Sequence, residues 1–520
     1  MLIIPLFKVY MSETAPDIVG ETLMSGMITQ GKKVEEFEDR LKEFFDWPWV
    51  LTLNSATSGL CLANRLLGVT EQDEVISTPL TCFATTCGII PHTRKIVWAD
   101  TDSSTCNIDL DDVKKKLTKD TKVLSFVHWG GVPVNIDKVI EVQAYAKETF
   151  GNDLNVVQDC AHAFGAKWNG RNLGTHSQPC GIGHHIAVYS LQAIKHLTTG
   201  DGGVIILPNE ELYHRAKILR WYGIDRDRRS LPGTDFRLEP DVPEAGYKFH
   251  MNDIAASIGL SNFYGLEARL DKYRENAEYY GQELCGLETV ELFPVEDLAV
   301  SSYWIYTLKI KNGLKKKFID FMTTGDVMVS QVHARNDKHS CVKDCVTFLP
   351  ELDQLEGEIV SIPSGWWVGE DERKYIVSRI RMFDSTTTPD PPERFIVPLR
   401  VEDCDEYRSL LVHLNGHDGE PSPVFSTEGT YVVKVGRKIV AAATLIVIHR
   451  MYDPTGHIED VVTHPAYRHR GHGKALIQRL TAFAVEKGCY KVVLSCADEV
   501  QPFYTSCGYN REGALMTSRK

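Results

Sequence analysis

The sequence predicts an α/β protein of two units, a larger one built on a mostly parallel sheet and a smaller α/β one that follows it. At 520 residues the chain exceeds the size at which one hydrophobic core stops growing, so two or three domains are expected. The first 260 residues alternate short apolar runs with segments of helical period, which is typical of a parallel sheet covered by helices. The Thr- and Pro-rich segment DSTTTPDPP, residues 384–392, interrupts this pattern, and a new alternation follows it.

The elements of the first unit, residues 1–383, follow from periodicity. GKKVEEFEDRLKEFF, residues 31–45, has apolar residues at helical spacing. The segment 227–246 has no periodicity and predicts a long loop, and such loops inside a domain are usually functional. Mixed patterns over 268–382 predict a smaller α+β lobe. Short apolar runs predict strands at 49–55, 73–78, 95–100, 122–128, 154–159 and 202–207.

The second unit, residues 393–520, has its own order of elements. Residues 430–450 predict two strands around a Gly turn, and a third strand is expected at 456–465. A helix is expected at 471–488, a strand at 490–496 and a short helix at 500–509. This unit therefore has the size and element count of an independent domain, with 384–392 as the linker.

Composition and charge exclude several classes of protein. The chain is 43% hydrophobic and 24% charged, as soluble globular proteins are, and no apolar run approaches the ~20 residues of a membrane span. The first residues lack the basic region and cleavage site of a signal peptide. The net charge of −13, which resides before residue 393, argues against nucleic acid as the main partner. Thirteen cysteines without paired spacing predict free thiols and a cytoplasmic location.

The stretch VYSLQAIKHLTTGDGG, residues 188–203, places Lys195 among small and hydroxyl-bearing residues before a Gly-rich turn. A lysine that holds the aldehyde of pyridoxal phosphate (PLP) as an imine also needs a carboxylate at the pyridine nitrogen and donors for the phosphate. Asp159 ends the strand predicted at 154–159, at the edge where open α/β sheets bind ligands. NSATSG, residues 54–59, is a strand-to-helix turn with free amides. The alternative is a solvated lysine and an aspartate that caps a helix.

The motifs SGMITQGKKVEEFE, NSATSGLCLA, VVQDCAHAFGA, YSLQAIKHLTTGDGG and GYKFHMNDIAASIGL occur in this order along the first unit. Together they resemble the DegT/DnrJ family of PLP-dependent sugar-nucleotide aminotransferases, which have a fold-type I architecture. The resemblance implies that Lys195 tethers the cofactor and that Asp159 partners its pyridinium nitrogen. It implies that Ser190 and the amides of Ala56 and Thr57 hold the phosphate. It also implies a nucleotide-linked keto-sugar as substrate, glutamate as amino donor and a homodimer.

Several positions depart from the pattern of this family. His162 stands where the family has Gln near the 3-hydroxyl of the cofactor, and a satisfied core histidine is the alternative interpretation. Cys82 takes the place of the aromatic residue that stacks on the cofactor, so Phe83 is expected to supply that ring. Lys248 stands at the Asn that reaches the phosphate of the neighbouring subunit, and His250 replaces a nearby Arg. Lysine at the tether position implies amino transfer, because one branch of the family has His there and performs dehydration.

A second motif lies in the tail. RHRGHGKAL, residues 468–476, places two glycines where backbone amides can approach a pyrophosphate at a helix N-terminus, although a basic helix start on the surface is the alternative. With the following FYTSCGY, this segment resembles the GNAT acetyltransferases, and more narrowly glucosamine-6-phosphate N-acetyltransferase. The resemblance implies acetyl-CoA as cofactor. The residues expected to bind it are Arg468, Arg470, Gly471, His472, Gly473 and Lys474.

Amide formation needs a deprotonated amine and a proton for the departing thiolate. By resemblance, Tyr504 protonates or hydrogen-bonds the sulfur, and Glu459 and Asp460 accept the proton of the amine directly or through water. A packed aromatic ring and a solvated strand carboxylate are the alternatives for Tyr504 and Glu459. Ser495 departs from the family, because the glucosamine-6-phosphate enzymes carry there an acidic residue that positions the amino group.

Three functions follow from these motifs. In the first, the chain transaminates a nucleotide-linked keto-sugar and then acetylates the new amine for glycan biosynthesis. In the second, the tail acts separately on glucosamine 6-phosphate and gives N-acetylglucosamine 6-phosphate. In the third, the chain is a binding or scaffold protein with decayed sites, which the intact Lys195, Asp159 and Gly471/Gly473 turn disfavour. No metal site, nucleic-acid partner or membrane partner is predicted.

Overall fold

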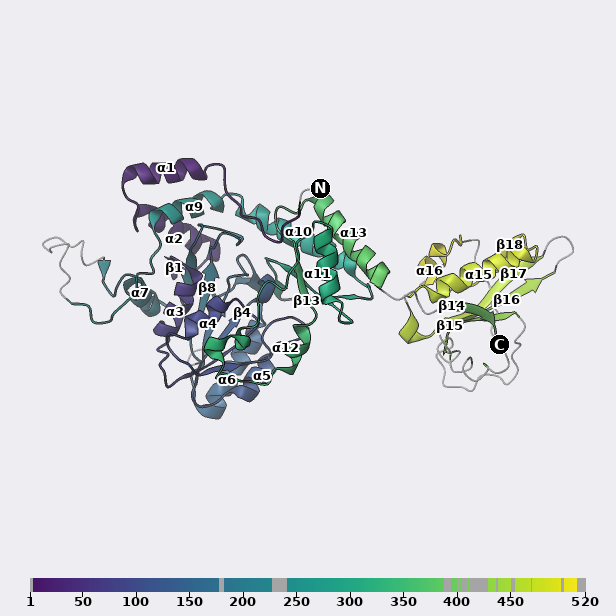
Figure 1. Ribbon diagram of the computed structural model, residues 1–520, viewed down its shortest axis with the longest axis horizontal. Coiled ribbons are helices and arrows are strands. Elements are labelled where there is room, and N and C mark those ends of the chain that lie inside the picture. The colour runs from purple at the N-terminus through teal and green to yellow at the C-terminus, as the bar shows by residue number, and fades with distance from the viewer. Residues whose placement is uncertain are drawn as a thin grey trace. The chain divides into compact units, whose positions relative to one another are not determined.

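The computed structural model of the chain divides into two compact units, residues 1–387 and 388–520, and each is described by itself (Figure 1). Residues 227–240 of the predicted loop and 388–392 of the predicted linker fall outside the described residues, and residues 241–246 of the loop contain neither helix nor strand. Within the first unit the structure describes residues 3–176, 182–226 and 241–387. Within the second it describes residues 394–399, 403, 407, 410, 429–435, 438–449, 454–468, 470–496 and 500–511.

A seven-stranded sheet in the order β1-β9-β8-β5-β4-β2-β3 forms the centre of the first unit (Figure 1). Its strands run parallel except β9, which pairs antiparallel with β1 and with β8. The predicted α/β class is confirmed. The strands are β1 (Val50–Leu53), β2 (Glu74–Ser77), β3 (Ile96–Trp98), β4 (Thr121–Val127), β5 (Asn155–Asp159), β8 (His185–Ser190) and β9 (Gly203–Ile206).

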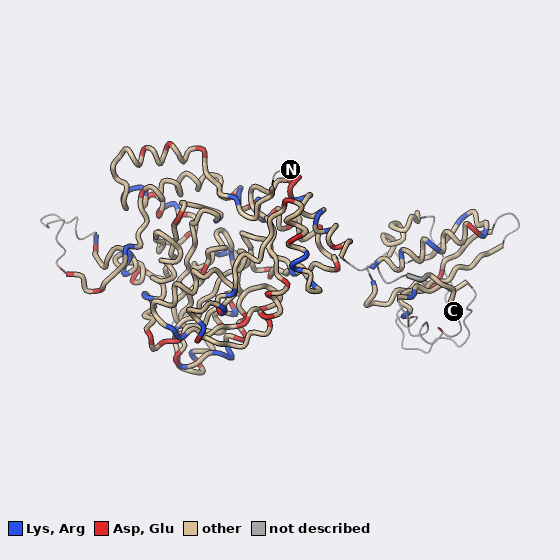
Figure 2. The backbone as a smooth tube through the Cα atoms, viewed as in Figure 1, with Lys and Arg blue, Asp and Glu red and all other residues tan. Residues whose placement is uncertain are grey.

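Helices cover both faces of this sheet because its strands are apolar on both sides. In β5, for example, Val157 packs in the same core as Leu60 of α3, whereas Val156 packs in the same core as Val139 of α6. Basic and acidic residues are interspersed along the backbone of the unit (Figure 2). The helices are α1 (Ala15–Ser25), α2 (Lys32–Phe45), α3 (Ala56–Leu66), α4 (Phe83–Ile89), α5 (Leu110–Lys116), α6 (Ile136–Phe150), α7 (Glu210–Leu219) and α9 (Asp253–Phe263).

The predicted α+β lobe completes the first unit. Its antiparallel sheet has the order β10-β12-β13, and the N-terminal segment joins the lobe through a bridge between Ile4 and Val327. A separate small sheet has the order β11-β6-β7. The elements are β6 (Lys167–Trp168), β7 (Arg171–Asn172), α10 (Leu266–Leu284), β10 (Val290–Leu292), β11 (Ala299–Val300), β12 (Tyr306–Ile310), α11 (Lys315–Thr324), α12 (Pro350–Leu355), β13 (Ile359–Ile362) and α13 (Glu370–Thr387).

The last helix corrects the start of the predicted linker. The Thr-rich composition predicts a linker at residues 384–387, but these residues form the last turn of α13. The turn is held because Asp384 accepts hydrogen bonds from the backbone N–H and the hydroxyl of Thr289, each 2.7 Å long, next to the buried Phe383. These tertiary contacts override a weak local preference.

The second unit is a five-stranded sheet in the order β14-β15-β16-β17-β18, with α15 packed on it. Its neighbouring strands are antiparallel except β17 and β18, which are parallel. The edge strand β14 is an element that the sequence pattern did not predict. The elements are β14 (Arg394–Pro398), β15 (Thr430–Val435), β16 (Lys438–Ile448), β17 (Thr455–Thr463), α15 (His472–Glu486), β18 (Lys491–Leu494) and α16 (Gln501–Ser506). In the parts of the chain that the structure describes, no helix has the length and apolar character of a membrane span.

Candidate active sites

The carboxyl ends of the parallel strands bring the predicted residues of the first site together. Asp159 ends β5 and Ser190 ends β8, and Lys195 lies in the loop that follows β8. Ser190 pairs with Gly203 of β9, which also pairs with Leu53 at the end of β1. This shared partner brings Ser190 close to the turn that leads from β1 into α3.

That turn has the geometry of a phosphate cradle. Ser55 caps α3, and its hydroxyl accepts a hydrogen bond of 3.1 Å from the N–H of Ser58. Ala56 and Thr57 open the helix, so their amides have no intrahelical acceptor and can bind an anion. A Cβ atom at Gly203 would lie 2.6 Å from the amide nitrogen of Ala56, so only glycine allows this close approach.

Asp159 is a buried carboxylate with two hydrogen-bond donors. The hydroxyl of Thr85 in α4 donates to Oδ2 at 2.6 Å, and the N–H of Ala161 donates to Oδ1 at 3.0 Å. Burial raises the pKa of Asp159, while these two donors and the nearby Lys195 oppose the rise. A nearby positive charge stabilises the charged form of a buried carboxylate, and a protonated pyridine nitrogen would supply such a charge.

Lys195 is half-buried, and its amine lies 3.3 Å from the ring centroid of Trp304. The Trp304 ring is itself fixed, because its Nε1 donates a 2.9 Å hydrogen bond to the carbonyl of Ile194. Burial lowers the pKa of Lys195 to about 7, although Asp159 and Cys82 act in the opposite direction. The amine therefore has a substantial neutral fraction near pH 7, as a nucleophile toward an aldehyde requires.

This pKa gives a testable expectation for the rate at which cofactor-free protein captures PLP. Because the neutral amine is the reactive form, the rate should rise with pH and reach half of its maximum near pH 7. Stopped-flow absorbance over pH 5.5–10 measures the profile. A midpoint near the ordinary lysine value of about 10.4 would show that the amine is not in the buried setting described.

His162 lies beside this lysine. It is buried, stacks on Trp304 with ring centroids 4.0 Å apart, and places its Nε2 3.4 Å from Nε2 of His333. Its other ring nitrogen, Nδ1, has no hydrogen-bond partner among the described residues. A core histidine with both ring nitrogens hydrogen-bonded is therefore not what the described residues show for His162. Its unpartnered Nδ1 fits a site that receives a polar ligand.

Three further predicted residues lie around this centre. Phe83, which is predicted to supply the ring that stacks on the cofactor, opens α4, and its ring makes an edge contact with His339 with centroids 4.8 Å apart. Lys248 is exposed, and its carbonyl accepts a 3.2 Å hydrogen bond from the side chain of Asn54. His250 is buried against Trp221, with ring centroids 3.9 Å apart. Lys248 is thus adjacent to the phosphate cradle of its own chain.

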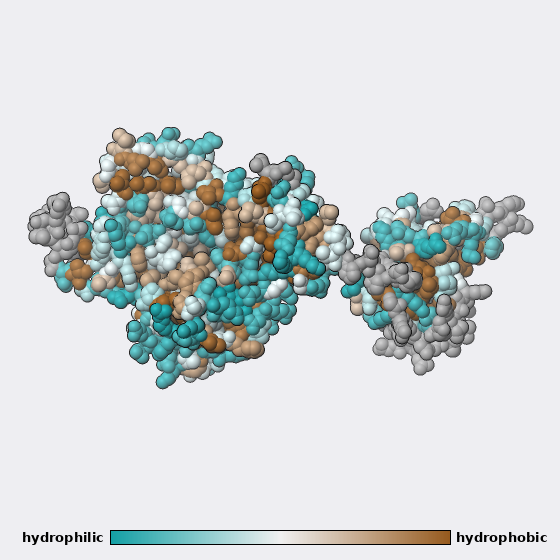
Figure 3. All heavy atoms as spheres, in the orientation of Figure 1, coloured by the Kyte–Doolittle hydropathy of each residue, from teal (hydrophilic) through white to brown (hydrophobic). Residues whose placement is uncertain are grey.

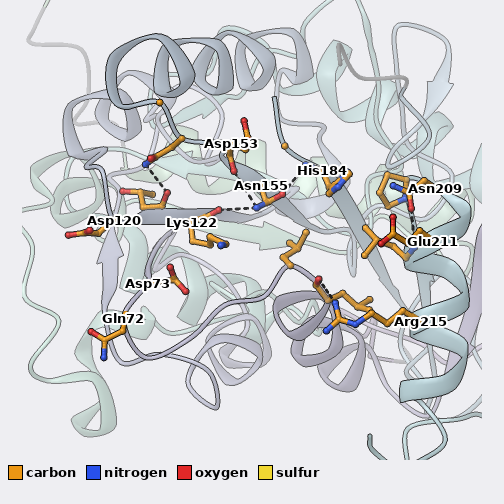
Figure 4. A pocket seen from close by; sticks show the side chains of 18 of the residues that line it. Gln72, Asp73, Asp120, Lys122, Asp153, Asn155, His184, Asn209, Glu211 and Arg215 are labelled. Carbon is orange, nitrogen blue, oxygen red and sulfur yellow. Dashed lines mark hydrogen bonds between the residues drawn. The ribbon is translucent and has the colours of Figure 1, made fainter. Parts of the chain in front are cut away.

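A hollow of about 950 Å³ lies at the opposite edge of the sheet, where the strands begin (Figure 4). Asp120, Lys122 and Asn155 line it on one side and Glu211 and Arg215 on the other (Figure 4). It contains neither Lys195 nor Asp159. The side chains that the sequence predicts for the reaction therefore lie at the carboxyl edge of the sheet and not in this hollow.

The second site lies around the start of α15. Gly471 precedes the helix with a φ of 75°, a left-handed conformation that favours glycine. A Cβ at Gly473 would lie 3.1 Å from the hydroxyl of Thr463 and 3.3 Å from the ring of Phe503, so the turn packs closely against the end of β17. Around this turn, Arg468 and Arg470 are exposed, Lys474 is half-buried and His472 is buried.

The proposed proton-transfer groups lie near a split in the sheet. Pairing between β17 and β18 ends at Ile458 and Leu494, whereas β17 continues to Thr463. Glu459 and Asp460 follow directly and are exposed, and Asp460 has a φ of 54° where the register with β16 shifts.

Tyr504 is half-buried in α16. Burial first, and then the thiols of Cys496 and Cys507, raise the pKa of Tyr504 to about 12. The phenol therefore keeps its proton at neutral pH, so Tyr504 is available as a hydrogen-bond donor.

The pattern that defines the DegT/DnrJ/EryC1/StrS aminotransferase family matches residues 10–381. The chain belongs to this family. The acetyltransferase (GNAT) family matches residues 396–509, so the aminotransferase is followed by a GNAT domain. Both predicted families are confirmed. Aminotransferases of this family depend on PLP, and GNAT domains use acetyl-CoA.

Solved structures resemble the aminotransferase unit. AtS13 from Actinomadura melliaura is 41% identical with a TM-score of 0.69, and the match covers 74% of this chain and 99% of that chain. The sugar aminotransferase CalS13 from Micromonospora echinospora is 37% identical with a TM-score of 0.68, covering 73% and 100%. Among characterised relatives, GDP-perosamine synthase of Escherichia coli O157:H7 is 27% identical over 62% of this chain and 84% of its own length.

The candidate aminotransferase site also contains residues that the sequence patterns did not identify. Trp304, His333 and Thr85 contact Lys195, His162 and Asp159, respectively. Thr85 follows the predicted Phe83 by two residues, and the hydroxyl-rich FATT segment was the available signal. Trp304 and His333 come from the small lobe, more than 100 residues after Lys195, where no local pattern marks them.

Proposed function

We propose that the chain is a bifunctional enzyme that makes an N-acetylated amino-sugar nucleotide for glycan biosynthesis. The first unit would transaminate a nucleotide-linked keto-sugar with glutamate as amino donor, and the GNAT domain would acetylate the new amine. The observation that carries this proposal is the assembly of Lys195, Asp159 and the phosphate cradle in the same chain as a GNAT domain. Relatives support the substrate class, since one is a GDP-perosamine synthase and another, from Campylobacter jejuni strain 81-176, a transaminase of a UDP-linked amino-sugar.

In the first reaction, bound PLP supplies an electron sink that stabilises negative charge at the carbon losing a proton. We assign the capture of the aldehyde, and the later movement of the proton, to the Lys195 amine, whose pKa of about 7 allows both protonation states. Asp159 would keep a proton on the ring nitrogen. Ser190 and the amides of Ala56 and Thr57 would hold the phosphate.

In the second reaction, we assign binding of the pyrophosphate of acetyl-CoA to the turn around Gly471 and Gly473, with the basic residues of the same segment. Glu459 or Asp460 would take the proton of the attacking amine. Tyr504 would return a proton to the departing thiolate, since its raised pKa keeps the phenol protonated.

The proposal includes a homodimer in the cytoplasm. Apolar side chains gather over α1 and α9 (Figure 3), where Met24 is 89% exposed and Tyr264 is 86% exposed. An exposed apolar surface of this kind marks an interface more often than a solvated face. Every cysteine in the described part of the chain is a free thiol, which supports a reducing compartment.

Mass spectrometry of the products formed from a nucleotide-linked keto-sugar, glutamate and acetyl-CoA tests this function. The competing function is acetylation of glucosamine 6-phosphate, which the narrower resemblance of the tail suggests. The exposed Ser495, directly after β18, is the residue that distinguishes the two acceptors, because an acidic side chain at this position would attract an ammonium group.

We expect Ser495→Asp to raise kcat/KM for glucosamine 6-phosphate relative to the amino-sugar nucleotide. One hydrogen bond to a charged group is worth roughly 1.5–3 kcal/mol, so the ratio should change by about one to two decades. Ser495→Asn is the matched control, since it has a similar size and no charge. If the wild-type protein already prefers glucosamine 6-phosphate, the coupled function is wrong.

A further inference from the structure

Two histidines from different parts of the first unit meet beside Lys195. His162 comes from the turn after β5, and His333 comes from the loop before α12 in the small lobe. Their rings are nearly parallel, with an interplanar angle of 8° and centroids 5.4 Å apart, and their Nε2 atoms are 3.4 Å apart. This pair joins the lobe to the candidate site through one hydrogen bond.

The loop that carries His333 is held in an unusual conformation. Val332 has a φ of 73°, which is costly for a β-branched residue and persists only where the surroundings impose it. The hydroxyl of Ser330 accepts from the N–H of Val332 at 3.0 Å, and the Gln331 amide donates to the carbonyl of His333 at 3.0 Å. These contacts fix the backbone at the position from which the imidazole reaches His162.

The two imidazoles share one proton between their Nε2 atoms. Burial lowers the pKa of His333 to about 4 and that of His162 well below its ordinary value, and Lys195 adds to both effects. The other charged or titratable groups nearby are Asp159, which is hydrogen-bonded to Thr85 and Ala161, and His196, whose Nε2 donates to the carbonyl of Ser302. With both rings neutral, only one of the facing nitrogens can carry hydrogen while the other accepts it.

The position of this proton decides what His162 offers to a ligand. His162 is 1% exposed, and its Nδ1 has no partner among the described residues. If His162 donates through Nε2, then Nδ1 is an acceptor; if His162 accepts there, Nδ1 carries a proton and is a donor. The phosphate, carbonyl and hydroxyl oxygens of a PLP and sugar-nucleotide site are mainly acceptors, so they match the second state.

We propose that His333 is a positioning residue that donates its Nε2–H to His162 and thereby keeps a proton on Nδ1 of His162, facing the bound cofactor or substrate. The inference rests on the proposed assignment of Lys195 and Asp159 to the aminotransferase site. It adds a residue of the small lobe, acting through His162, to the groups that orient the ligand.

Two substitutions separate hydrogen bonding from packing. His333→Gln keeps an N–H donor, whereas His333→Phe keeps a flat ring without one. We expect the Phe variant to lower kcat for amino transfer by about tenfold or more with a smaller change in KM, and the Gln variant to recover most of the loss. The pH midpoint of the visible absorbance of bound PLP should shift in the Phe variant and return toward the wild-type value in the Gln variant. His214→Ala, in the exposed part of α7, is the control, and circular dichroism verifies folding.

A double variant tests whether His333 acts through His162. A His162→Gln protein has no imidazole whose protonated nitrogen His333 could set. Adding His333→Phe to it should therefore have little further effect on kcat or on the pH midpoint of the PLP absorbance. The inference is overturned if His333→Phe has the wild-type kcat and absorbance midpoint. It is also overturned if His333→Phe has the same effect with His162 and with Gln at position 162, or if His333→Gln and His333→Phe lose the same amount of amino transfer. If Lys195→Ala loses amino transfer and His333→Phe does not change it, this inference alone is rejected. If Lys195→Ala keeps amino transfer, the proposed site itself is rejected.

Discussion

Replacement of Lys195 by Ala is expected to abolish amino transfer and to leave acetyl transfer intact. The substitution removes the amine that captures the aldehyde and moves the proton, so amino transfer should fall at least about 10³-fold. Removal of the amine takes a nearby positive charge away from the buried Asp159, but this carboxylate keeps its hydrogen bonds from Thr85 and Ala161, so the protein is expected to fold. Acetyl transfer should continue, because Tyr504 belongs to the other compact unit.

Amino transfer and acetyl transfer are assayed separately, and the visible absorbance of PLP reports whether the cofactor is still bound to the protein through an imine. Lys316→Ala is the matched control, since the side chain of Lys316 in α11 is 86% exposed. Loss of both activities in a protein that still folds would count against independent sites.

Asp159→Asn is expected to retain PLP and to lose most turnover, by about 10²-fold or more. Retention follows because the tether and the phosphate cradle are unchanged. Turnover falls because a neutral amide cannot hold the proton on the ring nitrogen, and the N–H of Ala161 then faces an oxygen or an NH₂ group instead of a carboxylate. Asp153→Asn, an exposed position before the start of β5, is the control.

The pH dependence adds a second readout for Asp159. Burial raises the pKa of this carboxyl, so the charged form that supports turnover is lost as the pH falls through that raised value. The wild-type rate should therefore have an acidic limb that the Asn variant lacks. A near-normal rate for Asp159→Asn would remove Asp159 from the site.

The large sheet of this protein follows closely from its sequence. Strands such as 154–159 are short, apolar and bounded by turn residues, so six of the seven strands could be predicted, and Asp159 could be placed at a strand end. The interior strand β8 (His185–Ser190) was not among the predicted strands. The antiparallel direction of β9 could not be predicted, because it depends on the pairing of Gly203 with both Leu53 and Ser190, which are distant in the sequence or on another strand. The end of α13 was also set by a distant contact, the one between Asp384 and Thr289.

The candidate aminotransferase site was predictable where its residues occur in contiguous motifs. Lys195, Ser190 and the turn at 54–59 lie in such motifs. Trp304 reaches Lys195 and His333 reaches His162 only after the small lobe folds against the sheet, so neither spacing nor composition could identify them. The role of His162 likewise depends on its neighbours, since the sequence alone could not say which of its nitrogens would be satisfied.

The central claim is that two reactions on one chain act in sequence on the same sugar. The most direct measurement is mass spectrometry of products from a panel of nucleotide-linked keto-sugars, incubated with the PLP-loaded protein, glutamate and acetyl-CoA. The account predicts an amino-sugar nucleotide when acetyl-CoA is omitted and its N-acetylated form when acetyl-CoA is present. It is contradicted if the amino-sugar nucleotide stays unacetylated while glucosamine 6-phosphate, supplied to the same protein, is converted to N-acetylglucosamine 6-phosphate.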